Sequence, residues 1–329
     1  MFTVEAVLTL SNRYNSAMEM QTLLTASLAL RTPVLAASGT FGYGVEALDL
    51  TDGADLGALI TPTLTVEPRA GSPMPRTVEA YSGLLHALGL PNPGLAQFVR
   101  EIAPTLAERP YPVIVSVWAD RNTEWERLAE ALTETGTVAA LELNLTPANL
   151  LFSERSGDSP LSEVEQLESL AAAVAAARRG TSLPLIAKLP AGGVEIGAAA
   201  RAAEEAGADV IAVSQAFPAV AVRLSASRFR LPGVVGGLSG PAVKPLALYQ
   251  VWRVAQCVRL PILGSGGIMT TDDALEFLLA GATAVAVGVA GLIHPATGAH
   301  IVQGLRQYLV ENRLDDLRSV VGAALRQPR

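Results

Sequence analysis

Eight short apolar runs recur along the 329-residue chain, and stretches with helical spacing separate them. They occupy residues 33–37, 56–60, 112–118, 138–145, 184–189, 209–213, 261–263 and 283–287. Runs rich in Val, Ile, Leu and Ala without polar alternation are typical of strands buried on both faces of a parallel sheet. Eight such strands alternating with helices predict an α/β fold, a (β/α)8 TIM barrel.

Glycine turns precede four of these runs, in the sequences DGAD (52–55), TGT (135–137), AGAD (206–209) and AGAT (280–283). Glycine readily adopts the left-handed conformation that ends a helix, so we interpret this repeat as structural. Ser162 with Glu165 predicts a capping box, and Thr123 is predicted to cap the helix that follows it.

The composition excludes several classes of protein. Half the residues are apolar, enough for a large core, but no run approaches the roughly 20 residues that cross a bilayer. A net charge of −7 argues against nucleic acid as the main partner. The single cysteine, Cys257, favours a reducing cytoplasm, and its helical surroundings predict a buried structural thiol. No His, Cys, Asp or Glu grouping has the spacing of metal ligands.

Residues 1–19 show no clear period, so we expect a frayed extension or the product of an upstream start codon, with residues 20–329 forming one barrel domain. Two long insertions interrupt the alternation, residues 66–99 after the second run and 218–240 after the sixth. Both follow the carboxyl ends of strands, where barrel enzymes build their sites. Because both are too apolar for solvated connections, we expect them to form walls or lids of a site.

The stretch from residue 260 to 290 indicates strand, glycine turn, helix and strand. Gly266 and Gly267 follow the seventh run, and Gly288 follows the eighth. Backbone N–H groups in such turns form a nest that binds anions, and phosphate sites of barrels lie after strands seven and eight. The alternative is that these glycines only tighten loops, and the local pattern supports both interpretations equally.

Several motifs extend this pattern over the chain: SGTFG (38–42), EPR (67–69) with PR (75–76), ALGL (87–90) with NPG (92–94), ELN (142–144), GGLSGPAVKP (236–245) and GSGGIMTTDDALEFLLAGATAV (264–285). Their order and spacing resemble the dihydroorotate dehydrogenase family of pyrimidine biosynthesis, and within it the class that works with an NAD-linked electron-transfer subunit. The resemblance implies an FMN flavoprotein, an oxidoreductase with a small-molecule substrate, and either a homodimer or pairing with that subunit.

By position, the resemblance implies that Gly266, Gly267 and Gly288 hold the FMN phosphate with Gly240 beside it. It also places further residues along the flavin, namely Ser38, Thr63, Ser116, Asn144, Lys188, Ser214 and Val289. Three of these are replacements: Ser116 stands for asparagine, Val289 for threonine, and Ser214 for an apolar neighbour. Lys188 has an independent argument, because it ends a strand and points a cation where a reduced flavin carries negative charge.

The substrate side departs from the family pattern. The family's strand-two lysine falls on Pro62, and the loop whose cysteine is the proton-abstracting base reads NLTPAN (144–149), which puts Pro147 at the base position. An orotate-binding asparagine is His86, and an Asn-Thr pair is Gln215-Ala216. The other substrate positions that the resemblance implies are Leu88, Gly89, Leu90, Asn144 and Asn149.

Proline has no ionisable group, and general-base catalysis contributes about 100- to 10,000-fold in rate. We therefore expect a diverged FMN-binding enzyme with weak or no dihydroorotate oxidation and another small cyclic substrate. His86 is the candidate base, since imidazole titrates near neutrality, although it equally fits as a filler of the lost asparagine's space. Thr146 is the weaker candidate. Two alternatives stay open: a genuine dihydroorotate dehydrogenase with a substitute base, and a non-catalytic barrel that acts as a binding or scaffold protein.

Overall fold

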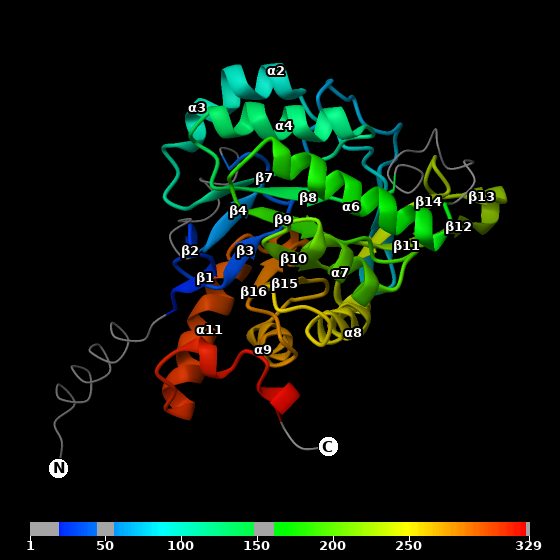
Figure 1. Cartoon of the computed structure of the whole chain (residues 1–329). Coiled ribbons are helices and arrows are strands. Elements are labelled where there is room, and N and C mark those ends of the chain that lie inside the picture. The colour runs from blue at the N-terminus through cyan, green and yellow to red at the C-terminus, as the bar shows by residue number, and fades with distance from the viewer. Residues whose placement is uncertain (1–19, 45–55, 148–160, 327–329) are drawn as a thin grey trace, which may run out of the picture.

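The computed structural model describes residues 20–44, 56–147 and 161–326. The predictions for residues 1–19, for the turn at 52–55 and for Asn149 lie outside these ranges. The structure is a closed barrel of eight parallel strands surrounded by helices (Figure 1), which confirms the predicted (β/α)8 fold. Its strands are β3 (Val34–Ala36), β4 (Ala58–Ile60), β7 (Val113–Val117), β8 (Ala140–Asn144), β9 (Leu185–Lys188), β10 (Val210–Val213), β15 (Ile262–Ser265) and β16 (Ala284–Val287). Each lies in or overlaps one of the eight apolar runs.

The longer described helices pack around the outside of the barrel. They are α4 (Asn122–Glu134), α6 (Glu163–Arg179), α7 (Ile196–Glu205), α8 (Lys244–Val254), α9 (Thr271–Leu279) and α11 (Thr297–Asn312). A helical segment before β7 consists of α2 (Leu95–Gln97), the π-helical η1 (Phe98–Ile102) and α3 (Ala103–Leu106), and α10 (Val289–Ile293) follows β16. Short 3-10 turns are η3 (Leu224–Ala226), η4 (Pro241–Val243), η5 (Leu317–Ser319) and η6 (Ala323–Arg326).

Two hydrophobic cores hold the fold together. The larger lies between the helices and the outer face of the barrel. The smaller fills the barrel interior, where Ile60, Ile114 and Ile186 belong to the same cluster as Leu24 and Leu28. Those leucines come from the hairpin of β1 (Thr22–Thr25) and β2 (Leu28–Leu30), so the hairpin is part of the inner core and leaves the carboxyl ends of the strands for a site.

Local predictions were confirmed in part. Ser162 and Glu165 form the predicted capping box at the start of α6, and Gly136, Gly207 and Gly281 have positive φ. The prediction for Thr123 was wrong: α4 begins one residue earlier, at Asn122, with Arg121 as its N-terminal flanking residue and no side-chain cap. An ion pair between Arg121 and Glu124 spans that first turn.

The helical prediction for Cys257 was also wrong. Helix α8 ends at Val254, and Cys257 lies partly buried in the turn that follows. Its sulfur fits beside a neighbouring helix, because a Cβ added to Gly197 of α7 would lie 2.6 Å from it. None of the described helices is long and apolar enough to cross a membrane.

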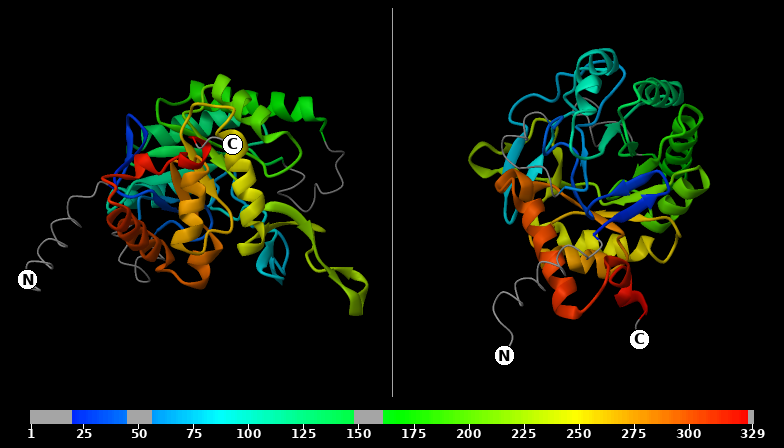
Figure 2. Two further views of the ribbon diagram at one scale, coloured as in Figure 1. Left: turned by 90° about the horizontal axis from the view of Figure 1, so that it is seen from below. Right: turned by 90° about the vertical axis from the view of Figure 1, so that its left-hand side faces the viewer.

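The two insertions combine into one antiparallel sheet, which the sequence did not indicate. Strands β5 (Thr77–Ala80) and β6 (Gly83–His86) come from the first insertion, and β11 (Phe217–Val220) and β14 (Val235–Ser239) from the second. The strand order is β11-β14-β6-β5, so β14 pairs with β6 and places Gly237 opposite His86. Beyond it, the hairpin of β12 (Val222–Arg223) and β13 (Arg228–Phe229) projects from the body of the molecule (Figure 2).

Candidate functional site

A cleft with two adjoining lobes lies at the carboxyl ends of the barrel strands, beneath the sheet formed by the insertions. The first, called here the glycine lobe, has a volume of about 320 Å³ and is lined by Gly240, Gly266, Gly267 and Gly288 among others. The second, called here the proline lobe, has a volume of about 280 Å³ and includes Pro62, Pro91, Pro190 and Pro218. The lobes share Ser38, Gly39, His86, Leu88, Lys188, Gln215 and Ala216. The insertions supply much of the wall, as their position predicted.

The glycine lobe requires glycine at Gly267. Its φ is 75°, and an added Cβ would lie 2.7 Å from the backbone nitrogen of Lys244 and 2.9 Å from the carbonyl oxygen of Gly240. At Gly288 an added Cβ would meet only Ala37, at 3.8 Å, so that backbone faces open space. The turns after β14, β15 and β16 therefore bring together Gly240, Gly266, Gly267 and Gly288, and binding of a phosphate there remains a prediction.

Ion pairing fixes the turn that carries Gly266 and Gly267. Asp273 accepts hydrogen bonds from the backbone of Met269 and Thr270, both at 2.9 Å, and Lys244 Nζ donates to its other oxygen at 2.7 Å. Burial alone would raise the pKa of Asp273, but the hydrogen bonds from Lys244 and the turn lower it. The turn is thus tied to α8 as well as to its own helix, α9.

A buried ion pair lies on neighbouring strands at the floor of the cleft. Lys188, the last residue of β9, has its Nζ 3.4 Å from Oε1 of Glu142 on β8. Only 12% of the Lys188 side chain and 1% of the Glu142 side chain are exposed. Glu142 belongs to the ELN motif, but the sequence analysis gave it no role. A carboxylate within an apolar run was the available signal, because a buried charge needs a partner.

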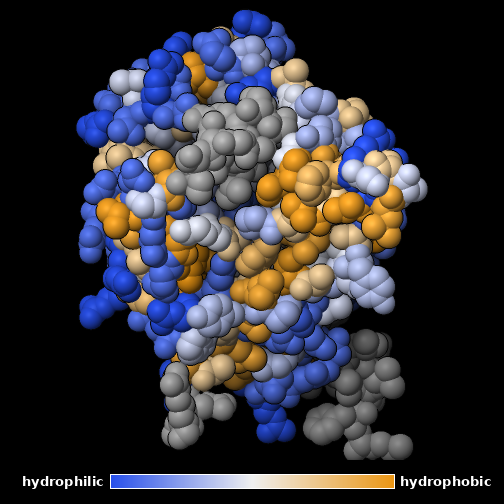
Figure 3. Space-filling model, turned by 90° about the vertical axis from the view of Figure 1, so that its right-hand side faces the viewer, coloured by the Kyte–Doolittle hydropathy of each residue, from blue (hydrophilic) through white to orange (hydrophobic). Residues whose placement is uncertain are grey.

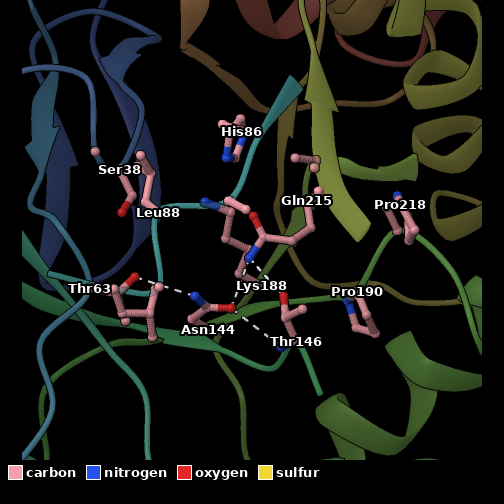
Figure 4. A pocket seen from close by; sticks show the side chains of 18 of the residues that line it. Ser38, Thr63, His86, Leu88, Asn144, Thr146, Lys188, Pro190, Gln215 and Pro218 are labelled. Atoms are coloured by element: carbon pink, nitrogen blue, oxygen red, sulfur yellow. Dashed lines mark hydrogen bonds between the residues drawn. The ribbon is translucent and has the colours of Figure 1, made fainter. Parts of the chain in front are cut away.

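A chain of neutral hydrogen bonds crosses the proline lobe (Figure 4). Gln215 Nε2 donates to Asn144 Oδ1 at 2.8 Å and to Thr146 Oγ1 at 2.9 Å. Asn144 Nδ2 donates to Thr63 Oγ1 at 3.3 Å, and the Thr63 hydroxyl shares a hydrogen bond of 3.0 Å with Ser116. The loop that carries Thr146 is held by Trp118, whose indole N–H donates to the Thr146 carbonyl at 3.1 Å.

His86 ends β6 and faces both lobes. Its Nε2 lies 3.2 Å from the hydroxyl of Ser239 on the paired strand β14. Burial, and then the positive charge of Lys188, lower the pKa of His86 below its ordinary value. The imidazole is therefore neutral at neutral pH and can accept a proton, but it is a weaker base than an exposed histidine.

The second candidate base, Thr146, has a donor beside its hydroxyl. Gln215 donates to Thr146 Oγ1, and among the described residues no bonded acceptor is positioned to take the hydroxyl proton. A hydroxyl needs such a base to become a nucleophile or a proton shuttle. In this structure the Thr146 hydroxyl therefore acts as an acceptor in the hydrogen-bond network, and within the described part of the chain it has no base to activate it.

The other predicted site residues divide by location. Leu88, Gly89 and Leu90 line the proline lobe, and Ser214 and Val289 line the glycine lobe. Ser38 lines both and donates to the Thr61 carbonyl at 2.8 Å. Ser116 lines neither, since it is fully buried behind Thr63. The described residues contain no cluster of three or more His, Cys, Asp or Glu side chains that could hold a metal ion.

Comparison with known proteins identifies the family. The model of the family described as dihydroorotate dehydrogenase matches residues 21–309. A protein of Desulforudis audaxviator is 44% identical over 301 residues, covering 92% of this chain and 96% of the relative. A protein of Trichlorobacter lovleyi is 42% identical over 302 residues, covering 90% and 96%. One of Geotalea uraniireducens is 41% identical over 305 residues, covering 91% and 96%.

All three relatives are named dihydroorotate dehydrogenase B (NAD(+)), catalytic subunit. The match spans the barrel strands, both insertions and both lobes of the cleft, so it does not rest on the glycine turns alone. The chain therefore belongs to the dihydroorotate dehydrogenase family and is similar to its NAD-linked class, as the motifs of its sequence predicted.

Proposed function

We propose that this chain is an FMN-binding member of the family that has lost efficient oxidation of dihydroorotate and acts on another small cyclic compound. The observation that carries the proposal is a contrast within one cleft. The glycine lobe retains backbone that no larger residue could replace at Gly267, whereas the proline lobe has Pro62 at the family's lysine position. The resemblance implies that Pro147 stands at the position of the family's base.

The glycine lobe suits the phosphate of FMN. Gly240, Gly266, Gly267 and Gly288 line it and would supply backbone N–H groups, while Lys188 would stand beside the flavin ring with Asn144. FMN would supply the acceptor for a hydride, and the remaining task of the chain's own residues would be to bind the substrate and move a proton.

Under this proposal, the chain lacks the family's base for proton removal. Dihydroorotate oxidation takes a proton from one carbon while hydride leaves the neighbouring one, and Pro147 has no group to accept that proton. His86 is the titratable alternative in the described cleft, but burial and Lys188 lower its pKa. The loss of a positioned base costs about 100- to 10,000-fold in rate.

We also propose that the chain pairs with a second copy or with an electron-transfer subunit. The relatives are named as catalytic subunits of NAD-linked enzymes. Figure 3 shows apolar surface gathered on the face that carries the insertions. Exposed apolar residues there include Val220, Val222, Leu224 and Phe229. Light scattering of the purified chain, alone and mixed with a candidate subunit, would test the pairing.

Absorbance and turnover test the function. We expect purified protein to carry or take up FMN, seen as a flavin absorption band, and to oxidise dihydroorotate at least 100-fold more slowly than the Desulforudis relative assayed in parallel. Fumarate, a quinone and NAD should each be offered as acceptor. Turnover at the relative's rate would instead establish a genuine dihydroorotate dehydrogenase with a substitute base. Colourless protein that gains no flavin spectrum with added FMN would favour a binding or scaffold role.

A further inference from the structure

The residues that line the proline lobe determine which kind of ligand it can bind. Four proline rings form much of the lining, together with Ala87, Leu88, Leu90, Ala191, Ala216 and Val235. Asn144, Thr146 and Gln215 hydrogen-bond to one another along its floor, and Ser38, Thr63, His86 and Lys188 also line it (Figure 4). A ligand in this lobe therefore meets a surface that is more apolar than polar, with the Gln215 amide among its polar groups.

The side chains of the proline lobe that can carry positive charge are not free to bind a ligand carboxylate. Among the described residues that line it, Lys188 and His86 are the ones that can carry positive charge. Lys188 pairs with Glu142, whose side chain is 1% exposed, so a ligand carboxylate would compete with a buried carboxylate for the same ammonium group. His86 is held neutral by burial and by Lys188. A carboxylate that left water for this lobe would find no free cation to replace its hydration among these residues.

The hydrogen-bond network fixes the orientation of the amide groups. The backbone N–H of Thr146 donates to Asn144 at 3.3 Å, so the accepting atom must be the Asn144 oxygen. The Gln215 atom 2.8 Å from that oxygen must then be its nitrogen, which also donates to Thr146. The Gln215 oxygen is left as an acceptor, turned away from Thr146 in Figure 4. The lobe thus offers a fixed acceptor that needs a donor from the ligand.

We infer that the proline lobe binds a neutral planar ring with an N–H donor, such as a cyclic amide or imide, and discriminates against ring carboxylates. The ligand N–H donates to the Gln215 oxygen, and its faces and far edge pack on the prolines. Pro62 is the specificity-determining residue, because it lines the lobe with an uncharged ring at the position where the resemblance implies a lysine. This inference rests on the proposed function for the flavin but concerns the ligand alone.

Uracil and orotate are a matched pair of probes, since orotate is the uracil ring with a carboxylate added. We expect isothermal titration calorimetry on the FMN-loaded protein to give a dissociation constant for uracil at least tenfold below that for orotate. Equal or tighter binding of orotate would overturn the inference, and so would the absence of binding by both rings at millimolar concentrations.

Two variants of one residue test the cause. Pro62→Lys should tighten orotate binding tenfold or more and change uracil binding less than threefold, whereas Pro62→Met, similar in length but uncharged, should leave the preference for uracil unchanged.

A variant of Gln215 tests the hydrogen-bond acceptor. Gln215→Leu should weaken uracil binding about tenfold because the N–H loses its acceptor. Thermal melting of each variant verifies folding. An unchanged preference in folded Pro62→Lys would overturn the charge argument.

The flavin and the ligand are read out separately. Flavin absorbance reports whether FMN binds, and the same titrations with uracil and orotate can be repeated on protein without FMN. Protein that binds no FMN but still prefers uracil would overturn the proposed function and leave this inference standing. Protein that binds FMN but prefers orotate would overturn this inference and leave FMN binding standing.

Discussion

The buried pair of Lys188 and Glu142 leads to the strongest prediction about stability. We consider Lys188→Met, which keeps most of the aliphatic stem and removes the charge, leaving the Glu142 carboxylate 1% exposed without its cation. Two unit charges 3.4 Å apart attract by about 5 kcal/mol at an effective dielectric constant of about 20. Breaking a buried pair on one side typically costs about 3 to 5 kcal/mol, so we expect a loss of that size in the free energy of unfolding.

An exposed pair provides the matched control. Arg179 Nη2 lies 3.0 Å from Oε2 of Glu126, closer than the atoms of the buried pair, but these side chains are 56% and 36% exposed. Arg179→Met should cost about 0 to 1 kcal/mol, because water screens the pair. If distance alone decided the cost, Arg179→Met would destabilise the protein more than Lys188→Met. The comparison therefore isolates burial as the cause of the larger loss.

Urea unfolding followed by circular dichroism measures both losses in the free energy of unfolding, and Glu142→Gln, alone and combined with Lys188→Met, completes a double-mutant cycle. The double variant should recover most of the loss, since it leaves no uncompensated charge. Equal costs for Lys188→Met and Arg179→Met would refute the reasoning, and so would a double variant no more stable than Lys188→Met. Either result would mean that water reaches Glu142 or that the stem of Lys188, not its charge, supports the cleft.

Three further predictions concern the turn, the histidine and a helix cap. Gly267→Ala should weaken FMN binding tenfold or more in a fluorescence titration, whereas Gly136→Ala, also at positive φ but with no atom within 4 Å of the added Cβ, should leave it unchanged. An NMR titration of His86 should give a pKa below 6.5, and since the unfolded chain then binds the proton more readily, this residue's contribution to stability should fall as pH drops below about 6.5. Ser162→Ala should lower the free energy of unfolding by about 1 kcal/mol in a thermal melt, and Thr123→Ala should lower it less, because, of these two residues, only Ser162 caps its helix.

The barrel was predictable from the sequence because its signal is repeated and local. Each strand is an apolar run buried on both faces, and glycine turns precede four of the eight runs, so repeated local observations support one topology. The motifs at Gly266 and Gly267 were predictable for the same reason. Their conformation depends on the turn itself, and the crowding by Lys244 and Gly240 follows once the turn after β15 is formed.

The pairing of the two insertions could not be predicted in this way. Strand β6 and strand β14 are separated by about 150 residues, and their pairing places Gly237 against His86 through contacts that no local period encodes. The partners of Glu142 and Gln215 were missed for the same reason. Neither side chain stands out in its own segment of the sequence. Each gains its role only when another strand supplies its partner, Lys188 for Glu142 and Asn144 for Gln215.

Under the proposed function, the neutral network explains how a cleft without the family's substrate-binding groups can keep its own polar side chains paired. A buried polar group left unpaired costs about 1 to 3 kcal/mol, so a site that merely lost its substrate contacts would be destabilised at each one. Here the Asn144 oxygen accepts from Gln215 and Thr146, and its nitrogen donates to Thr63, so protein atoms satisfy the Asn144 amide and the Gln215 oxygen is left for a ligand. Proline at position 62 needs no partner at all. These side chains are therefore mutually consistent in a lobe where the lining Lys188 is already paired with Glu142, so the lobe needs no charged ligand to be stable.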